Sequence, residues 1–371
     1  MQELFTQYWH FLAVQNACKI NLFEAFIYAN TVKNFCDKAH CNPKAVQFLI
    51  HFLTEQGYLK TIQTKKYRFR SKNWYICTKK GIELSEFIPK SRLKTRKIYI
   101  PHTKIRIPKR KNCIPHTKTR IPKRKNCIPN PQSWKNACIL WGQEHLTAWQ
   151  NLDYTLKTGK PAFNELYKSN YFDYLADKPA QLQNYQQAMG EYARQDYAEV
   201  AIFLTALAPK ISNLPFVVAD IGGGLGVLTQ NLALAYPNIK FILADLPEVL
   251  AFAPNVAPNV KLYPLDFFKP LPFVADAMIL ARVLHDWDDE KVDILLKNCY
   301  DALPIGGKLY IFEIMQDEIS ANLLCLNMLL MCQSHERSSS EYLRLLTAHH
   351  FIFIDKKPFN SLQTLLIFEK K

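Results

Sequence analysis

The C-terminal half of the chain alternates between short apolar runs and segments with helical apolar spacing. Residues 216–219 (Phe-Val-Val-Ala) have the continuous hydrophobicity of a strand buried on both faces, and residues 227–235 repeat apolar side chains at the helical period. The alternation continues with further strands predicted at 240–244, 262–265, 276–280 and 309–312 and a helix at about 291–303. Strands that alternate with helices predict an α/β fold with a largely parallel sheet.

The N-terminal part has a different pattern. Residues 4–58 are dense in helical apolar spacing, with a short helix from Val32, a turn at 41–43 and a longer helix over Lys44–Glu55. Two short strands follow at Leu59–Ile62 and Lys66–Arg70. A helix-turn-helix followed by a hairpin indicates a winged-helix-like domain.

A winged helix can bind DNA through its second helix. Such a recognition helix should carry several Arg, Asn or Gln side chains on one face. The predicted helix Lys44–Glu55 offers only Lys44 and Gln47, whereas the helices between residues 4 and 29 are rich in apolar side chains. The apolar richness of these helices fits burial between two copies of the chain, in a homodimer, better than DNA recognition, with nucleic-acid binding as the alternative from a different class.

One segment carries almost all of the net charge. Between Lys90 and Lys135 there are 16 Lys or Arg and no Asp or Glu, which leaves −1 for the rest of a chain whose total is +15. Residues 100–113 recur at 114–127 with Ile105 replaced by Thr119, and Ile-Pro returns every seven residues. Regular prolines exclude a coiled coil, so we expect a solvated, extended, largely disordered insertion. A basic arm for nucleic acid or lipid is the alternative interpretation.

A glycine cluster joins the first strand of the C-terminal half to its helix. Residues 218–226 read Val-Ala-Asp-Ile-Gly-Gly-Gly-Leu-Gly, and four of the chain's 11 glycines lie in 222–226. Glycines there allow positive φ and close approach of a ligand to the backbone at a helix N-terminus. Asp245 ends the next strand, 23 residues after Gly222, where a carboxylate can accept hydrogen bonds from ribose hydroxyls. The pattern predicts an adenosyl ligand; an ordinary tight turn and a dinucleotide dehydrogenase are the alternatives.

Composition adds few constraints. The 371 residues are 49% apolar, which is ample for two cores, and no 18-residue apolar run exists. The N-terminus lacks the basic region of a secretory signal, and the ten cysteines show no metal-ligand spacing. We therefore expect a cytoplasmic protein with reduced thiols, no metal and no membrane association.

Seven motifs occur in order along the C-terminal half. They are Asp-Ile-Gly-Gly-Gly-Leu-Gly at 220, Ala-Asp-Leu-Pro at 244, Asp-Phe-Phe at 266, Leu-His-Asp-Trp-Asp-Asp-Glu at 284, Gly-Gly-Lys at 306, Leu-Asn-Met at 326 and Glu-Arg at 336. In this combination the chain resembles the S-adenosylmethionine-dependent O-methyltransferases of the caffeate and hydroxyindole type, including bacterial relatives. The resemblance implies a Rossmann-like methyltransferase domain preceded by a winged-helix-like dimerisation domain. The expected boundaries are 1–90 for dimerisation, 91–133 for the basic insertion, 134–207 for a helical connector that lines the substrate pocket, and 208–371 for the methyltransferase domain.

The resemblance also implies roles for individual residues. His285 is the general base, and Glu313 and Glu336 orient it. The residues expected to bind S-adenosylmethionine are Asp220, Gly222, Gly224, Asp245, Leu246, Asp266 and Phe267. Those expected to line the acceptor site are Met189, Tyr192, Asn327 and Met331. Arg282, beside the base, is interpreted as a structural cation.

A phenolic hydroxyl has a pKa of about 10, so its oxygen needs a base to become a nucleophile at neutral pH. Histidine, with an unperturbed pKa of about 6.5, is mostly neutral there and can accept the proton. We therefore expect O-methylation of a small aromatic or polyketide-like metabolite. N- or C-methylation, or a non-methylating use of the same cofactor, is the alternative within the fold.

Four departures from the family pattern fall near these motifs. Ala281 replaces a lysine of plant relatives, and Leu265 replaces a glycine. Gln333-Ser334 replaces Gly-Gly, and His349-His350 replaces Ala-Gly before Phe351. These changes bear on loop geometry more than on the reaction.

Overall fold

A computed structural model describes residues 2–62, 74–89, 127–130, 133–200, 216–254, 256–318, 321–360 and 362–371. The chain divides into two compact units, Met1–Gly142 (unit 1) and Gln143–Lys371 (unit 2). The predicted strand Lys66–Arg70 and residues 100–126 of the repeat lie outside the described residues, as do the predicted boundaries at 91 and 208. Within the described part, no helix is both long and apolar enough to cross a membrane.

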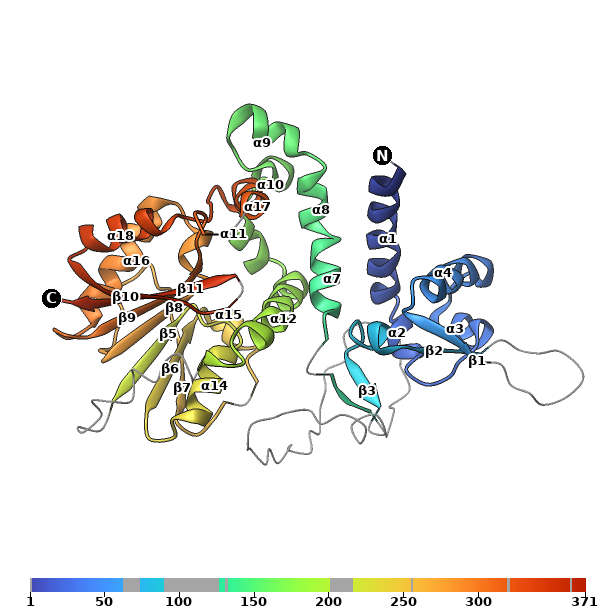
Figure 1. Ribbon diagram of the computed structural model, residues 1–371, viewed down its shortest axis with the longest axis horizontal. Helices are drawn as coiled ribbons and strands as arrows, with labels where there is room; N and C mark the ends of the chain where they lie inside the picture. The colour runs from blue at the N-terminus through green and yellow to red at the C-terminus, as the bar shows by residue number, and fades with distance from the viewer. Residues whose placement is uncertain are drawn as a thin grey trace, which may run out of the picture. The chain divides into compact units, whose positions relative to one another are not determined.

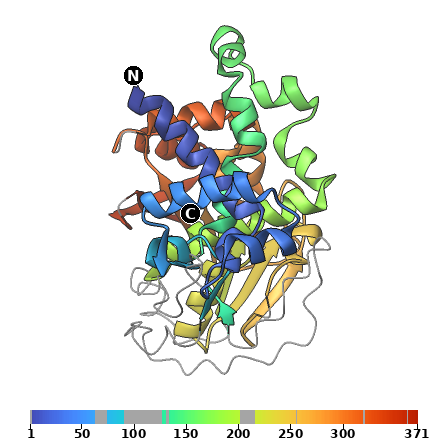
Figure 2. The same ribbon diagram turned by 90° about the vertical axis from the view of Figure 1, so that its right-hand side faces the viewer.

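Unit 1 is mostly helical. Its elements are α1 (Gln2–Lys19), α2 (Leu22–Ala25), α3 (Val32–Ala39), α4 (Pro43–Glu55), β1 (Leu59–Ile62), β2 (Trp74–Cys77), α5 (Lys79–Ile82), β3 (Phe87–Pro89), β4 (Cys127–Pro129) and α7 (Lys135–Trp141). The hydroxyl of Thr31 accepts the Asn34 N–H and so begins α3, and Gly57 takes a φ of 77° after α4. Helices α3 and α4 lie side by side, and α1 packs along α7 (Figures 1 and 2).

The predicted helices of unit 1 and the predicted strand at Leu59–Ile62 are confirmed. Strand β1 pairs antiparallel with β2, and β3 pairs antiparallel with β4. The side chains of Leu22, Phe23, Phe26, Ile50 and Leu53 are fully buried and form the centre of this unit's own core.

Unit 2 begins with helices and continues as an α/β layer structure. The helices are α8 (Glu144–Trp149), α9 (Leu152–Thr158), α10 (Ala162–Tyr167), α11 (Tyr171–Ala176) and α12 (Pro179–Asp196). The elements that follow are β5 (Val217–Ile221), α14 (Val227–Ala235), β6 (Lys240–Asp245), α15 (Pro247–Leu250), β7 (Val260–Pro264), β8 (Ala277–Ala281), the 3₁₀ turn η2 (Leu284–Asp286), α16 (Asp289–Ala302), β9 (Lys308–Ile314), α17 (Asn322–Cys332), α18 (Ser339–Ala348), β10 (Phe351–Pro358) and β11 (Gln363–Lys370).

The strands form one seven-stranded sheet in the order β10-β11-β9-β8-β5-β6-β7. Strands β7, β6, β5, β8 and β9 are parallel, and β11 runs antiparallel between β9 and β10. From β5 the chain adds β6 and β7 on one side of this strand, and it then returns to add β8 on the other side of β5. This change of direction makes the carboxyl ends of β5 and β8 the expected place for a ligand.

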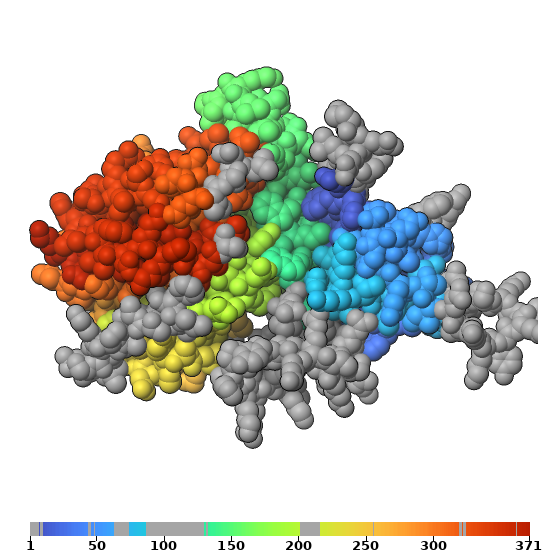
Figure 3. Space-filling view, viewed as in Figure 1, coloured from blue at the N-terminus to red at the C-terminus, as the bar shows by residue number. Residues whose placement is uncertain are grey.

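Helices cover both faces of the sheet (Figure 1). Helices α16 and α18 pack on one face through Leu295, Leu296 and Leu346, and α14 packs on the other through Leu228 and Leu232. The segments from α17 onward (orange to red) form a continuous surface over one side of the unit (Figure 3). The predicted Rossmann-like α/β fold is confirmed.

A separate aromatic cluster joins α10, α11 and α12 to α17. Phe163 stacks on Tyr167 at 4.5 Å and contacts Tyr171 edge-on at 5.1 Å. Leu330 and Met331 of α17 are buried in the same cluster. The helical character predicted for residues 134–207 is therefore confirmed where the structure describes it.

Candidate active site

The glycine loop follows β5 at the carboxyl edge of the sheet. The Gly222 N–H donates to the Ala244 carbonyl at 2.8 Å, which ties the loop to the end of β6. Gly222, Gly224 and Gly226 all have positive φ. A Cβ atom at Gly226 would stand 2.4 Å from Cδ2 of Leu243, so only glycine fits there.

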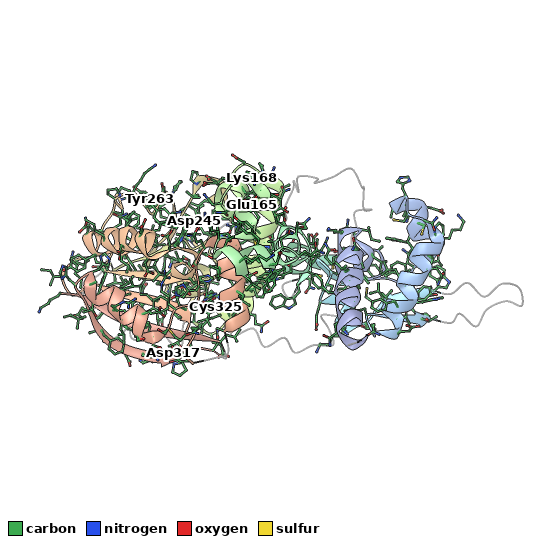
Figure 4. All side chains as sticks on the ribbon, turned by 90° about the horizontal axis from the view of Figure 1, so that it is seen from above. Glu165, Lys168, Asp245, Tyr263, Asp317 and Cys325 are labelled. Atoms are coloured by element: carbon green, nitrogen blue, oxygen red, sulfur yellow. The ribbon has the colours of Figure 1, made fainter. Side chains whose placement is uncertain are left out.

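Asp245 is fixed directly beside this loop. Its Oδ2 accepts the Gly224 N–H and its Oδ1 accepts the Leu246 N–H, each at 2.8 Å. Burial raises the pKa of Asp245 to about 6, although these two N–H donors oppose the rise. Asp245 and Tyr263 lie on one side of the unit, and Asp317 and Cys325 lie on the other (Figure 4).

Asp220 is fully buried at the end of β5. Its Oδ2 accepts the Thr229 hydroxyl at 2.5 Å, while Oδ1 has no hydrogen-bond partner among the described residues. Burial raises the pKa of this carboxyl to about 6. A Cβ atom at Gly223 would stand 2.7 Å from this carboxyl group, so Asp220 lies directly beneath the glycine loop.

Phe267 lies against the same loop. A Cβ atom at Gly222 would be 3.4 Å from Cε1 of Phe267. The Phe267 ring also meets Trp287 edge-on at 6.1 Å. Asp266 turns the chain here, because its Oδ1 accepts the Phe268 N–H at 3.0 Å. The predicted cofactor residues therefore gather at one edge of the sheet.

Gln186 of α12 was not expected at this edge. Its Oε1 lies 3.2 Å from the position that a Cβ atom would take at Gly224, and only 9% of the residue is exposed. A lone glutamine in a helix carries no sequence signal of such a position.

His285 lies in η2, directly after β8. Oε1 of Glu336 is 3.2 Å from its Nδ1, and Oδ1 of Asp286 is 3.5 Å from its Nε2. Burial and the charge of Arg282 lower the pKa of His285, but Asp286, Glu336 and Glu313 outweigh them and raise it overall.

The two predicted orienting carboxylates have different surroundings. Glu336 reaches the imidazole ring, whereas Oε1 of Glu313 accepts the backbone N–H groups of Val283 and Leu284 at 3.1 and 2.9 Å. Glu313 therefore fixes the turn that carries His285 and does not contact its ring within hydrogen-bond distance.

Ligand atoms of His285, Glu313 and Glu336 lie within 4.8 Å of one another, a spacing that suits one metal ion. The guanidinium of Arg282 already compensates these carboxylates: its Nη1 is 2.8 Å from both Glu313 Oε2 and Glu336 Oε2. The guanidinium thus supplies positive charge to both carboxylates of this group.

Two further side chains hold the η2 turn. Arg337 is 1% exposed and donates to the carbonyls of Leu284 and Trp287 at 2.7 and 2.8 Å. The Ser334 hydroxyl donates to the carbonyl of His285. Gln333 takes a φ of 60° at the end of α17, a conformation that glycine adopts more readily.

The expected acceptor residues fall into two groups. Oδ1 of Asn327 accepts the Trp149 indole N–H at 3.0 Å, and Met331 is buried in the aromatic cluster. Met189 and Tyr192 are half-buried on α12, and their roles stay predictions.

Aromatic side chains that the sequence did not single out stand near the base. Phe172 faces Trp287 at 4.9 Å, and Tyr185 meets Tyr171 at 5.6 Å. The half-buried Asp286 has its pKa raised to about 6, chiefly by burial.

The Rossmann-like sheet carries a glycine loop, an acid placed to bind ribose hydroxyls and a histidine paired with a carboxylate. This combination is typical of enzymes that use a cofactor with an adenosyl group. Residues 149–352 match the family model of the O-methyltransferase domain, which spans more than half of the chain. The chain belongs to the O-methyltransferase family.

Curated relatives agree with this assignment. The phenazine O-methyltransferase of Lysobacter antibioticus is 31% identical over 232 residues, which cover 60% of this chain and 66% of that protein. The (RS)-norcoclaurine 6-O-methyltransferase of Thalictrum flavum subsp. glaucum is 33% identical over 196 residues, covering 50% and 53%. The chain thus spans between about half and two thirds of the length of these relatives.

Solved structures share the fold over nearly the whole chain. Human N-acetylserotonin methyltransferase in complex with S-adenosylmethionine superposes with a TM-score of 0.75 at 21% identity, covering 100% of this chain and 96% of that one. The mitomycin 7-O-methyltransferase superposes with a TM-score of 0.75 at 18% identity, again covering 100% and 96%.

Proposed function

We propose that this protein is an S-adenosylmethionine-dependent O-methyltransferase that methylates a hydroxyl of a small aromatic metabolite. The observation that carries the proposal is the contact of His285 with Glu336 at the same carboxyl edge of the sheet as the glycine loop and Asp245. Several relatives are named for methylating phenolic or related aromatic compounds, among them 3-amino-4-hydroxybenzoate 4-O-methyltransferase of Streptomyces cremeus.

The residues at the carboxyl edge fit the proposed cofactor. Asp245 would accept the ribose hydroxyls, and Phe267 and Asp266 would hold the adenine. The glycine loop would receive the methionine part, where the side chain of Gln186 supplies a polar atom beside Gly224. S-adenosylmethionine, when bound, supplies a methyl group on a sulfonium sulfur that an oxygen nucleophile can displace in line.

The chain's own residues supply alignment and a base. Nε2 of His285 would accept the hydroxyl proton of the acceptor as the oxygen becomes nucleophilic. Glu336, at Nδ1, would hold the ring in the tautomer that leaves Nε2 free and would stabilise the imidazolium that forms. General-base assistance of this kind is typically worth on the order of 10²–10⁴-fold in rate.

This ring cluster, in which Phe172, Tyr185 and Trp287 are half-buried, suits a flat acceptor. Phe172, Trp287, Tyr171 and Tyr185 present aromatic surfaces close to Asp286 and His285. Aromatic faces of this kind favour aromatic ligands through offset or edge-on contacts. Unit 1 is proposed to serve dimerisation.

The proposal is tested by transfer of a labelled methyl group from S-adenosylmethionine to a panel of phenols and matched anilines. We expect phenol methylation that falls at least 10²-fold in His285→Gln and persists in the control His349→Gln, whose histidine pairs with Asp293 away from the site. Methylation of anilines alone, insensitive to His285→Gln, would indicate N-methylation and overturn the proposal.

A further inference from the structure

Arg282 leaves β8 in an unusual backbone conformation. Its φ is 57°, in the left-handed region that residues other than glycine rarely adopt. Its N–H donates to the Phe312 carbonyl of β9 at 2.9 Å, which fixes this conformation at the carboxyl edge of the sheet. The backbone therefore determines where the guanidinium is placed.

The guanidinium joins two carboxylates that come from separate parts of the chain. Nη1 donates to Glu313 Oε2 and Glu336 Oε2, each at 2.8 Å, and Nη2 donates to Glu336 Oε1 at 2.6 Å. Neither glutamate side chain has exposed surface. Glu336 is thus held by a two-pronged contact that fixes both of its oxygens.

The same nitrogen also reaches the base. Nη2 of Arg282 lies 2.9 Å from Nδ1 of His285, and Oε1 of Glu336 lies 3.2 Å from that atom. A guanidinium can only donate, so its contact requires a lone pair on Nδ1. A carboxylate can only accept, so its contact requires a hydrogen on Nδ1. Arg282 and Glu336 therefore favour opposite neutral tautomers of His285.

We propose that Arg282 is a positioning residue for the base: it fixes Glu336 against the imidazole and sets the pH at which Nε2 of His285 accepts a proton. Only the tautomer with hydrogen on Nδ1 leaves Nε2 free to accept a proton. The consequence for catalysis rests on the proposed function, but the effect of Arg282 on the protonation of His285 does not.

The carboxylates around His285 act in the opposite direction. Asp286 faces Nε2, Glu336 faces Nδ1, and Glu313 lies behind the guanidinium; each favours the imidazolium. Titratable side chains farther out are Tyr185 and Cys332 near Asp286, and Tyr342 near Arg282. Arg282 is the cation that contacts the imidazole, whereas Arg337 binds the carbonyls of Leu284 and Trp287. Removal of Arg282 should therefore make His285 easier to protonate.

The test follows the imidazole directly by NMR of the full-length protein labelled with ¹³C-histidine, with the His285 signal assigned by its absence in His285→Gln. We expect the pKa of His285 to rise by about one unit in Arg282→Met. Arg282→Lys keeps the charge but cannot reach both carboxylates and the ring at once, so it should give a smaller rise. An unchanged pKa of His285 in folded Arg282→Met would overturn the proposal.

Arg282→Met leaves two buried carboxylates without their cation and so threatens folding. The double variant Arg282→Met/Glu313→Gln restores the charge balance. Because Arg282 influences the pKa of His285 more strongly than Glu313 does, the rise should persist in the double variant. An unchanged pKa in the folded double variant would overturn the proposal as well.

Activity gives a second, separable readout. If phenols are methylated, the acid limb of kcat should move to higher pH in Arg282→Met, because His285 is then protonated and inactive over a wider range. If no acceptor is methylated while the pKa of His285 still rises, the proposed function fails and the role of Arg282 stands. If methylation occurs and the limb stays in place, the role of Arg282 fails and the proposed function stands.

Discussion

Oε1 of Glu336 lies 3.2 Å from Nδ1 of His285, although one residue follows α17 and the other lies in the turn after β8. Their coupling is electrostatic as well as geometric: the pKa of Glu336 is held well below its ordinary range, because His285 and Arg282 outweigh the cost of burial. The pair is the chemical centre of the proposed reaction.

Replacing Glu336 by Gln should lower kcat on the order of 10²-fold, because Nδ1 loses the partner that fixes the tautomer and stabilises the imidazolium. The matched control is Glu290→Gln, an exposed carboxylate in the Leu-His-Asp-Trp-Asp-Asp-Glu motif that contains His285. Initial rates at a saturating concentration of the acceptor compare kcat of both variants with that of the wild type. Equal rates for Glu336→Gln and wild type would show that the contact has no role in the reaction.

The pH dependence of kcat should report His285. Its folded pKa is raised, so the imidazole is protonated and unable to accept a proton up to a higher pH than usual. We expect activity to fall as pH decreases through a pKa above about 6.5, the ordinary value for histidine. In Glu336→Gln the limb should move to lower pH, since a carboxylate that favours imidazolium has been removed; movement to higher pH would contradict the assignment.

The sequence motifs predicted much of this site, because the end of a strand can be recognised from the residues next to it. Asp220, Asp245 and His285 each follow or end an apolar run, and parallel strands bring such ends to one edge. The contacts of Arg282, Gln186 and Phe172 could not be predicted, since they depend on how separate helices pack and on a left-handed backbone at a single position.

Two of the four departures from the family pattern share a backbone feature. Gln333 and His350 stand where the resemblance expects glycine, and both take positive φ, 60° and 64°. The fold thus keeps a glycine-type backbone without glycine. Strain of this kind is not visible in a single sequence, because either side chain is acceptable elsewhere.

His350→Gly should stabilise the protein. A residue other than glycine is destabilised by about 1–2 kcal/mol in the left-handed region. This cost exceeds the roughly 0.5–1 kcal/mol by which the backbone entropy of glycine disfavours folding. His349→Gly is the control: its φ is −91° and its ring bonds to Asp293, so it should lower the melting temperature. A fall in melting temperature in both variants would rule out relief of strain at His350.

Gly226→Ala and Gly306→Ala separate strain from overpacking. Both glycines have positive φ, but a Cβ at Gly226 would meet Leu243 at 2.4 Å, whereas nothing lies within 4 Å of one at Gly306. We expect Gly226→Ala to lower the free energy of unfolding by about 1–3 kcal/mol more than Gly306→Ala. Urea denaturation measures the difference, and equal losses would contradict the packing described for the loop.

Cofactor affinity should weaken in acid. Asp245 binds ribose hydroxyls best as a carboxylate, and its pKa is raised to about 6. The affinity for S-adenosylmethionine should therefore decrease as pH falls through about 6 and level off above it. Calorimetric titrations over this range measure the effect, and Asp245→Asn should remove the contribution of this residue; the same pH profile in the variant would assign the dependence to another group.

The central claim is that the carboxyl edge of the sheet binds S-adenosylmethionine. Calorimetric titration of the full-length protein with S-adenosylmethionine and, separately, with NADH tests it most directly, for wild type and Asp245→Ala. We predict saturable binding of S-adenosylmethionine that is lost in Asp245→Ala, and no binding of NADH. Binding of NADH, or no binding of S-adenosylmethionine by the folded wild-type protein, would contradict the account.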